Sequence, residues 1–425
     1  MRELRGPRPL EDLSLEVLSV LHLRAINEPL FPNLKYLGLW PVTREFIPFI
    51  PSLLSQRTTT IFISFAESSD LPNATVASMI ATFSTLCPNL ESICLQSLPK
   101  DPAITIAISG MLLANDGYSL RSLKVDSPLT EEAREMVHKL PNLRELSVVV
   151  ERDTSLPPLV LPNLTELDIK YEGDWLQIFH GAALGKLKSV TFYSGSEQIG
   201  DFLGAFERVA LAASAQNTLS WFCLRTSCSW NPNYPSLLTF TQLIHLTIEF
   251  SCDDGCSSTV DDDIVTNMAQ AMPKLEILEL GEPPCHEFPT GVTVKGLAAL
   301  AHHCPDLSAL RVHFQVASLS AMPADPGMTP NAGPAALRRD CALRDLEVGE
   351  IPIPEESVLV VAVILALIFP CIDFIDYVDE NWKKVSDAIY LSRQIFNSSS
   401  KEHPLFTPRS NFSDISSGTA PENGG

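Results

Sequence analysis

A short phrase of apolar residues with the spacing L-x-x-L-x-L recurs along the chain and dominates its hydrophobic pattern. Eleven clear copies open at Leu34, Leu90, Leu120, Leu143, Leu164, Leu187, Leu219, Leu243, Leu275, Leu307 and Leu343. A weaker copy opens at Thr58, and two more open at Leu10 and Ile372, which brings the count to fourteen. Most intervals between openings are 21 to 36 residues long, enough for one strand and one helix or extended return.

Each phrase predicts a short strand that is buried on one side. Side chains alternate across a strand, so the fourth and sixth positions of the phrase face the same way, and the first position completes the buried edge. A proline often stands shortly before the first position, as in FPNL, CPNL and LPNL, where it ends the preceding helix and turns the chain into the next strand.

The segments between phrases predict helices. In LTEEAREMVHKL the apolar residues lie on one helical face, and Thr130 suits the helix start. Similar stripes follow Thr75, Asp261–Asp263 and Thr293. The twelve-residue apolar run Val358–Phe369 is expected to be a buried helix that Pro370 ends, and Asn381–Ile395 is expected to be an amphipathic helix that closes the array.

These elements predict an α/β solenoid, with a curved parallel sheet on the concave face and helices and extended returns on the convex face. We expect residues 1–395 to form one domain of about fourteen irregular repeats, including the closing helix. Residues 396–425 are rich in Ser, Pro, Asn and Gly and are expected to be a disordered tail.

Composition narrows the function. The 425 residues carry a formal charge of -21, which disfavours nucleic acid as a partner, and the longest apolar run is too short for the ~20 residues that cross a bilayer, so no membrane association is expected. Ten cysteines are scattered along the chain, and the start MRELRGPRPL has no apolar leader. Both features favour a cytoplasmic or nuclear location.

The phrase with its preceding helix and Cys-Pro or Leu-Pro resembles the repeats of F-box/leucine-rich-repeat proteins, especially the large fungal group. The most specific stretch is Met272–Phe314, and FPCIDFIDYVDENWKKV is similar to that group's closing segment. The resemblance implies the substrate-binding region of a ubiquitin-ligase receptor. No F-box precedes the repeats, so we expect lost upstream sequence or a partner over that edge, with ligase adaptor and cullin as partners only if an F-box exists upstream. The alternative is a scaffold or regulator unrelated to ubiquitin.

Positions three, five and seven of each phrase are predicted to face the concave side, where a target protein would bind. Seven residues are the candidates for this binding: Tyr36, Trp40 and Phe62 in the early repeats, and Tyr193, Trp221, Arg225 and His245 in the middle repeats. On the same face we count eleven acids (Asp12, Glu16, Asp126, Glu145, Glu166, Asp168, Glu249, Glu279, Asp345, Glu347 and Asp376) against four bases (Lys124, Lys170, Arg225 and Arg311). A partner with a basic surface is therefore favoured. The alternative is that the acids are only a solvated face and that the tryptophans pack beneath loops.

The sequence contains no glycine-rich phosphate loop, nucleophile elbow or zinc-protease motif, which are common signatures of catalysis. His302, His303 and Cys304 end a predicted helix, and Cys252 and Cys256 bracket two aspartates, but neither group has the spacing of a zinc site. We therefore predict a protein that is not an enzyme and has no cofactor or metal.

Overall fold

The structure is a computed structural model. It describes residues 3–4, 19–20, 23, 29–66, 71–114, 119–151, 161–171, 184–194, 206–208, 210, 215–227, 236–251, 260–281, 291–316, 341–349, 351–377 and 379–399.

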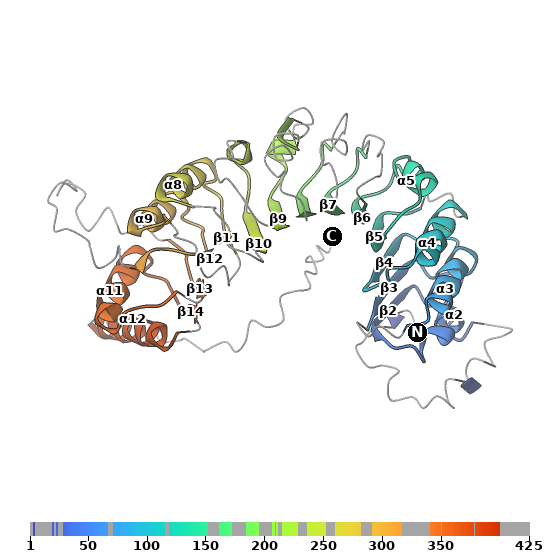
Figure 1. Ribbon diagram of the computed structural model, residues 1–425, viewed down its shortest axis with the longest axis horizontal. Helices are drawn as coiled ribbons and strands as arrows, with labels where there is room; N and C mark the ends of the chain where they lie inside the picture. The colour runs from blue at the N-terminus through green and yellow to red at the C-terminus, as the bar shows by residue number, and fades with distance from the viewer. Residues whose placement is uncertain are drawn as a thin grey trace.

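A single fourteen-stranded sheet runs through the molecule, and its strands follow one another in chain order. Every neighbouring pair is parallel. The strands are β1 (Glu3–Leu4), β2 (Tyr36–Val42), β3 (Thr60–Phe65), β4 (Ser92–Gln96), β5 (Ser122–Pro128), β6 (Glu145–Val150), β7 (Glu166–Tyr171), β8 (Ser189–Ser194), β9 (Trp221–Ser227), β10 (His245–Ser251), β11 (Ile277–Leu280), β12 (Ala309–Val312), β13 (Asp345–Gly349) and β14 (Phe374–Tyr377). Figure 1 shows that the sheet curves into an arc and lines its inner, concave side.

The helices lie along the outer side of the arc (Figure 1). The α-helices are α2 (Ile50–Leu53), α3 (Asn73–Leu86), α4 (Pro102–Ala114), α5 (Glu131–Val137), α8 (Asp262–Ala271), α9 (Val294–His303), α11 (Val358–Ile368) and α12 (Glu380–Ser399). Short 3₁₀ helices are η1 (Ile47–Phe49), η2 (Ala215–Asn217), η3 (Leu237–Thr239) and η4 (Glu355–Ser357). The expected α/β class, parallel sheet and outer helices are confirmed.

The core lies between the sheet and the outer helices and is built from the apolar positions of the phrase. From the phrase at Leu34 to the phrase at Ile372, the first and fourth positions are at most 4% exposed. The sixth position is also buried, except at Val148 and Tyr377, which are partly buried against the core. The burial that the L-x-x-L-x-L pattern predicts is thus confirmed along the described sheet.

A repeated backbone hydrogen bond joins each phrase to the next. The carbonyl oxygen at position two accepts from the N–H groups at positions two and three of the following phrase, over N···O distances of 2.7–3.1 Å. The accepting carbonyls belong to Lys35, Thr59, Glu91, Arg121, Arg144, Thr165, Lys188, Ser220, Ile244, Glu276, Ser308 and Arg344. We call this series the junction ladder, and it sets the same register at every step.

The weakest phrase shows how a polar residue replaces leucine in the core. Thr58 is fully buried at position one. Its hydroxyl donates to the carbonyl oxygen of Leu34 at 3.1 Å and accepts from the N–H of Ser55 at 3.1 Å. Because both hydrogen-bonding roles of the hydroxyl are used, its burial is tolerated.

The first strand differs from the prediction. The neighbour of β2 is Glu3–Leu4, with Glu3 opposite Tyr36 and Leu4 opposite Leu37. The phrase predicted at Leu10 is therefore not the strand beside β2, and its residues lie outside the described part of the chain. The spacing of apolar residues does not by itself decide which of two nearby segments forms the strand beside β2.

Three of the predicted helix starts are confirmed by their caps, whereas α3 begins at Asn73, before the predicted Thr75. The side chains of Thr130, Asp261 and Thr293 accept hydrogen bonds from backbone N–H groups in the first turns of α5, α8 and α9. Asp262 also ties α8 to the next repeat, because its carboxylate accepts from the N–H groups of Thr293 and Gly296 and from the Thr293 hydroxyl. Capping here joins neighbouring repeats as well as starting helices.

Four phenylalanines fill the core behind the middle strands. Phe192, Phe206, Phe222 and Phe240 are at most 1% exposed, and their ring centroids lie 5.5–6.5 Å apart. These distances and the mostly tilted or edge-on ring angles are favourable for aromatic pairs. We call this group the phenylalanine cluster.

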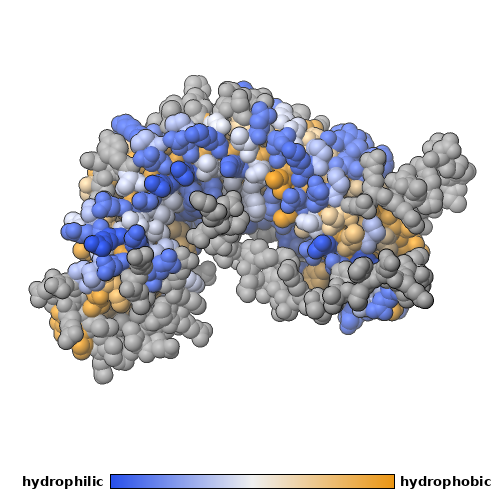
Figure 2. All heavy atoms as spheres, turned by 180° about the vertical axis from the view of Figure 1, so that it is seen from behind, coloured by the Kyte–Doolittle hydropathy of each residue, from blue (hydrophilic) through white to orange (hydrophobic). Residues whose placement is uncertain are grey.

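Helix α11 departs from its predicted burial. It forms within the predicted run Val358–Phe369, but Leu359, Val360, Val363 and Leu367 are 70%, 43%, 59% and 59% exposed. Figure 2 shows hydrophobic side chains at this end of the arc. The helix is apolar all round while only one side meets the core, so composition could not reveal the exposed side. Within the described residues, no helix has the length and apolar character to cross a bilayer.

Helix α12 closes the sheet beyond β14. It extends to Ser399, four residues past the predicted end at Ile395, and the remaining residues of the predicted tail, 400–425, lie outside the described part. Trp382 of α12 is fully buried, with its ring 5.9 Å from that of Phe314, and its Nε1–H donates to the carbonyl oxygen of Ile351 at 2.7 Å. Trp382 therefore anchors α12 to the last repeats.

Candidate functional site

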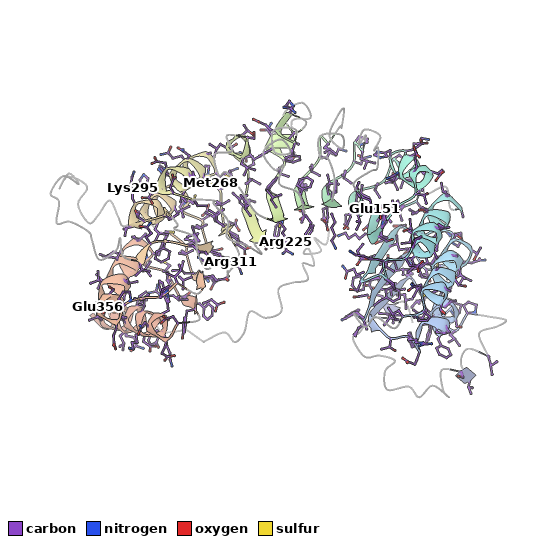
Figure 3. The ribbon with its side chains drawn as sticks, in the orientation of Figure 1. Glu151, Arg225, Met268, Lys295, Arg311 and Glu356 are labelled. Carbon is purple, nitrogen blue, oxygen red and sulfur yellow. The ribbon has the colours of Figure 1, made fainter. Side chains whose placement is uncertain are left out.

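The strand register arranges the concave side chains in rows. Row three crosses the sheet through Tyr36, Thr60, Ser92, Ser122, Glu145, Glu166, Ser189, Trp221, His245, Ile277, Ala309, Asp345 and Phe374. Row five crosses it through Gly38, Phe62, Cys94, Lys124, Ser147, Asp168, Thr191, Cys223, Thr247, Glu279, Arg311, Glu347 and Asp376. Row seven includes Lys170, Tyr193, Arg225 and Glu249 in the middle. Figure 3 shows Arg225 and Arg311 on the inner side of the arc, and Lys295 and Glu356 on the outer side.

The early aromatic candidates gather over β2 and β3. Trp40 and Phe62 make an edge-to-face contact, with ring centroids 5.7 Å apart. Gly38 lies between Tyr36 and Trp40 on the same strand, and a Cβ placed there would meet the Tyr36 ring at 2.7 Å and the Trp40 ring at 3.2 Å. Glycine therefore gives both rings room to lie over the strand. All three candidates are half-buried, which suits a contact surface.

In the middle of the face, Trp221 stacks on His245. Their ring centroids are 3.6 Å apart and the planes differ by 19°. Trp221 is 43% exposed, whereas His245 is only 8% exposed. The expectation that position three faces solvent is therefore wrong for His245, because the larger Trp221 ring covers it. A partner would meet the tryptophan, and the histidine supports it from one side.

A hydrogen-bond chain fixes the orientation of the His245 ring. The Thr247 hydroxyl donates to the Glu279 carboxylate at 3.1 Å, so its oxygen accepts from Nε2 of His245 at 2.7 Å. Nε2 then carries the proton and Nδ1 is an acceptor, which is buried without a partner among the described residues. Thr247 was not among the predicted residues. Its position two residues after His245 places it in row five beside Glu279, and this signal could have identified it.

Arg225 and Tyr193 form a second contact group beside this stack. The Arg225 guanidinium carbon lies 5.2 Å from the Tyr193 ring centroid, and the Lys170 ammonium lies 5.5 Å from it. Arg225 also pairs with Glu249, whose side chain is largely buried. The tyrosine thus lies between two cations in row seven, and the ion pair limits the conformations of Arg225. The structure therefore brings Tyr193, Trp221, Arg225 and His245 together on adjacent strands.

The acidic character of the face is partly neutralised within the sheet. Lys124 lies 2.9 Å from a Glu145 carboxylate oxygen and 3.4 Å from that of Glu166, and Arg311 pairs with Glu347 at 2.6 Å. Burial alone would lower the pKa of Lys124, but the two glutamates raise it. Of the predicted acids, Asp12 and Glu16 lie outside the described residues, and the remaining nine still outnumber the four bases.

Burial raises the pKa of several carboxylates on this face. Burial raises the pKa of Asp168, while the Ser147 hydroxyl, which donates to it at 3.0 Å, and the Lys170 charge act against the rise. Burial also raises the pKa of Asp126, which accepts from the backbone N–H groups of Ser97 and Leu98. These carboxylates therefore take up a proton more readily than exposed ones.

The thiols of Cys94 and Cys223 and the hydroxyl of Thr247 are covered. Burial raises the pKa of Cys94 to about 11 and that of Cys223 to about 12, so both remain protonated thiols at neutral pH. Thr247 is only 3% exposed, and its hydroxyl is used in the chain to Glu279. These three groups are therefore shielded from solvent.

The cysteine and histidine groups named from the sequence are placed only in part. Cys304 is buried behind α9 with its sulfur near the carbonyl oxygens of Ala269 and Met272, and the His302 and His303 rings lie 4.6 Å apart. Cys252 and Cys256 lie outside the described residues. Across the part of the chain that is described, no cluster of three or more His, Cys, Asp or Glu side chains could hold a metal ion.

Comparison with known proteins gives no relative: no protein-family model matches the chain, and no curated protein matches it.

Protonation of His245 is expected to destabilise the fold in acid. Burial lowers the pKa of the imidazole from 6.5 to about 4, although the Glu279 carboxylate acts in the opposite direction. Between these values the unfolded chain binds a proton that the folded chain does not. The neutral His245 ring therefore contributes up to ~3 kcal/mol to the free energy of unfolding. This contribution is complete above pH 6.5 and is lost as the pH falls to about 4.

Urea unfolding of the wild type and of His245→Gln, from neutral pH to about pH 4, measures this contribution. The free energy of unfolding should fall more steeply with acidification in the wild type, since only the wild type has the imidazole. Equal slopes in the two proteins would show that His245 is not held neutral by the fold.

Proposed function

We propose that this chain is a leucine-rich-repeat recognition solenoid with no catalytic role, which holds a target protein against its concave face. The observation that supports this most directly is the continuous register of rows three and five, which presents side chains from successive repeats on one curved surface. Curved arrays of this kind give an extended binding surface. The exposed Trp221 and the half-buried Tyr36, Trp40 and Phe62 supply the aromatic contacts that dominate protein interfaces.

Charge supports a target with a basic surface. The nine acids and four bases of the described concave face leave an excess of negative charge, and the whole chain carries -21. Complementary charge accelerates association and excludes acidic competitors. The partly neutralised acids around Lys124 and Arg311 limit this effect to a moderate one.

The specific role we propose is that of the target-binding region of a ubiquitin-ligase receptor of the F-box/leucine-rich-repeat type. The support is the resemblance of Met272–Phe314 to the repeats of that group, in the order strand, loop, helix, strand. Ligase adaptor and cullin would join through an F-box module. Without such a module, the same surface would serve a scaffold or regulator.

Capture of partners from cells tests the proposal. Charge reversal on the concave face, with Arg225→Glu and Glu347→Lys combined, should reduce the recovery of bound proteins about tenfold or more, because both side chains lie on the binding surface. Lys295→Glu on the outer side is the matched control and should leave recovery unchanged. Quantitative mass spectrometry of the captured proteins is the measurement.

The identities of the captured proteins separate the roles. Ligase adaptor and cullin among them support the receptor, and a reproducible partner without ligase subunits supports the scaffold. Partners that resist the concave substitutions but are lost with Lys295→Glu would contradict recognition by the concave face.

A further inference from the structure

The exposed indole of Trp221 has one covered face and one open face. His245, from the following strand β10, stacks against it at 3.6 Å. The opposite face of the indole therefore turns toward β8, where the residue in register with Trp221 is Ser189. A serine is too small to cover an indole, so the described neighbours in this row leave that face open, in agreement with the 43% exposure of Trp221.

Carboxylates stand beyond Ser189 in the same row. Glu166 is in register with Ser189, and Glu145 is in register with Glu166. Two strand spacings place the Glu166 backbone about 10 Å from that of Trp221. A planar group stacked on the indole would lie over Ser189 and within reach of the Glu166 side chain, which is 43% exposed.

The charge around this place is negative. Among the residues that the structure describes, Glu145 and Glu166 share the cation Lys124, which is closer to Glu145 (2.9 Å) than to Glu166 (3.4 Å). The other nearby cations serve other partners: Arg225 is paired with Glu249, and Lys170 lies over the Tyr193 ring. Glu166 therefore has the capacity to bind a further positive charge.

We propose that Trp221, Ser189 and Glu166 form a subsite for one arginine side chain of the target protein, and this proposal rests on the proposed function. The guanidinium stacks on the open face of the indole over Ser189, and its N–H groups donate to the Glu166 carboxylate. Tryptophan is the best aromatic partner for a cation, and guanidinium is planar and weakly hydrated, so it stacks better than the lysine ammonium. The His245 ring holds the indole in place before binding.

Fluorescence anisotropy with labelled octa-arginine tests the subsite in about 0.15 M salt, where long-range attraction to the acidic chain is largely screened. Octa-arginine should bind more tightly than octa-lysine, and octa-glutamate should not bind. Trp221→Ala should weaken octa-arginine binding about tenfold or more. Glu166→Gln should weaken it severalfold and reduce the preference for arginine over lysine.

Two further variants make the test specific. Ser189→Arg places a guanidinium beside the indole within the chain itself and should block octa-arginine as strongly as Trp221→Ala does. Tyr390→Ala removes an exposed aromatic side chain of α12, outside the concave rows, and should leave the affinity unchanged. Circular dichroism and an unchanged unfolding midpoint show that each variant is folded.

An octa-arginine affinity that is the same in the wild type, Trp221→Ala and Ser189→Arg overturns the subsite. So does a loss in Tyr390→Ala equal to that in Trp221→Ala. Neither result bears on recognition by the concave face, which the capture experiment with Arg225→Glu and Glu347→Lys decides separately. Conversely, a functioning subsite in a chain that captures no cellular protein would refute the proposed function alone.

Discussion

Phe222→Ala is expected to lower the free energy of unfolding by about 3–5 kcal/mol. The Phe222 ring is fully buried in the phenylalanine cluster, with centroids 6.2, 5.8 and 6.5 Å from those of Phe192, Phe206 and Phe240. Its removal takes apolar area out of the core and leaves a cavity that three large rings cannot fill without moving. Urea unfolding followed by circular dichroism measures the loss.

The chain offers a matched control in Phe374, which is also on a strand but is 48% exposed. Phe374→Ala should cost less than about 1 kcal/mol, because little buried surface is lost. Phe222→Leu should fall between the two. Equal losses for Phe222→Ala and Phe374→Ala would show that the cluster is not packed as described.

Trp382→Ala is expected to destabilise the C-terminal end of the solenoid by about 3–5 kcal/mol. The substitution removes a fully buried ring that packs on Phe314, and it leaves the carbonyl oxygen of Ile351 without its donor. Repeats contact only their neighbours, so the effect should remain local. Hydrogen exchange should show loss of protection in β13, β14, α11 and α12, while β2–β5 keep theirs.

Trp382→Phe separates packing from hydrogen bonding. It retains an aromatic ring and removes the donor, so the expected loss is about 1–3 kcal/mol, from the unpaired carbonyl oxygen. A fall in protection spread evenly from β2 to β14 after Trp382→Ala would contradict a locally closing helix.

The core was predictable because the spacing of apolar residues in the phrase determines which side chains are buried. Strand alternation turns positions four and six of the phrase toward the core, position one completes the buried edge, and even Thr58 follows this rule by bonding to the backbone. The helix starts at Thr130, Asp261 and Thr293 were predictable for a similar reason, since a short polar side chain before an apolar stripe is suited to capping.

The surface was predictable only in part, because it depends on neighbours in other repeats. Position three predicts exposure for His245, but Trp221 from the preceding strand covers it. The uniformly apolar helix α11 predicts burial, but only one of its sides meets the core. Likewise, the count of acids did not reveal that Lys124 lies between two of them.

The junction ladder gives every step of the arc the same backbone link, two hydrogen bonds to one carbonyl oxygen. Strand pairing and the packed core join neighbouring repeats as well. Small rotations at successive junctions would add along the array and change the distance between the two ends of the arc. The curvature of the concave face can therefore adjust to the size of the bound protein.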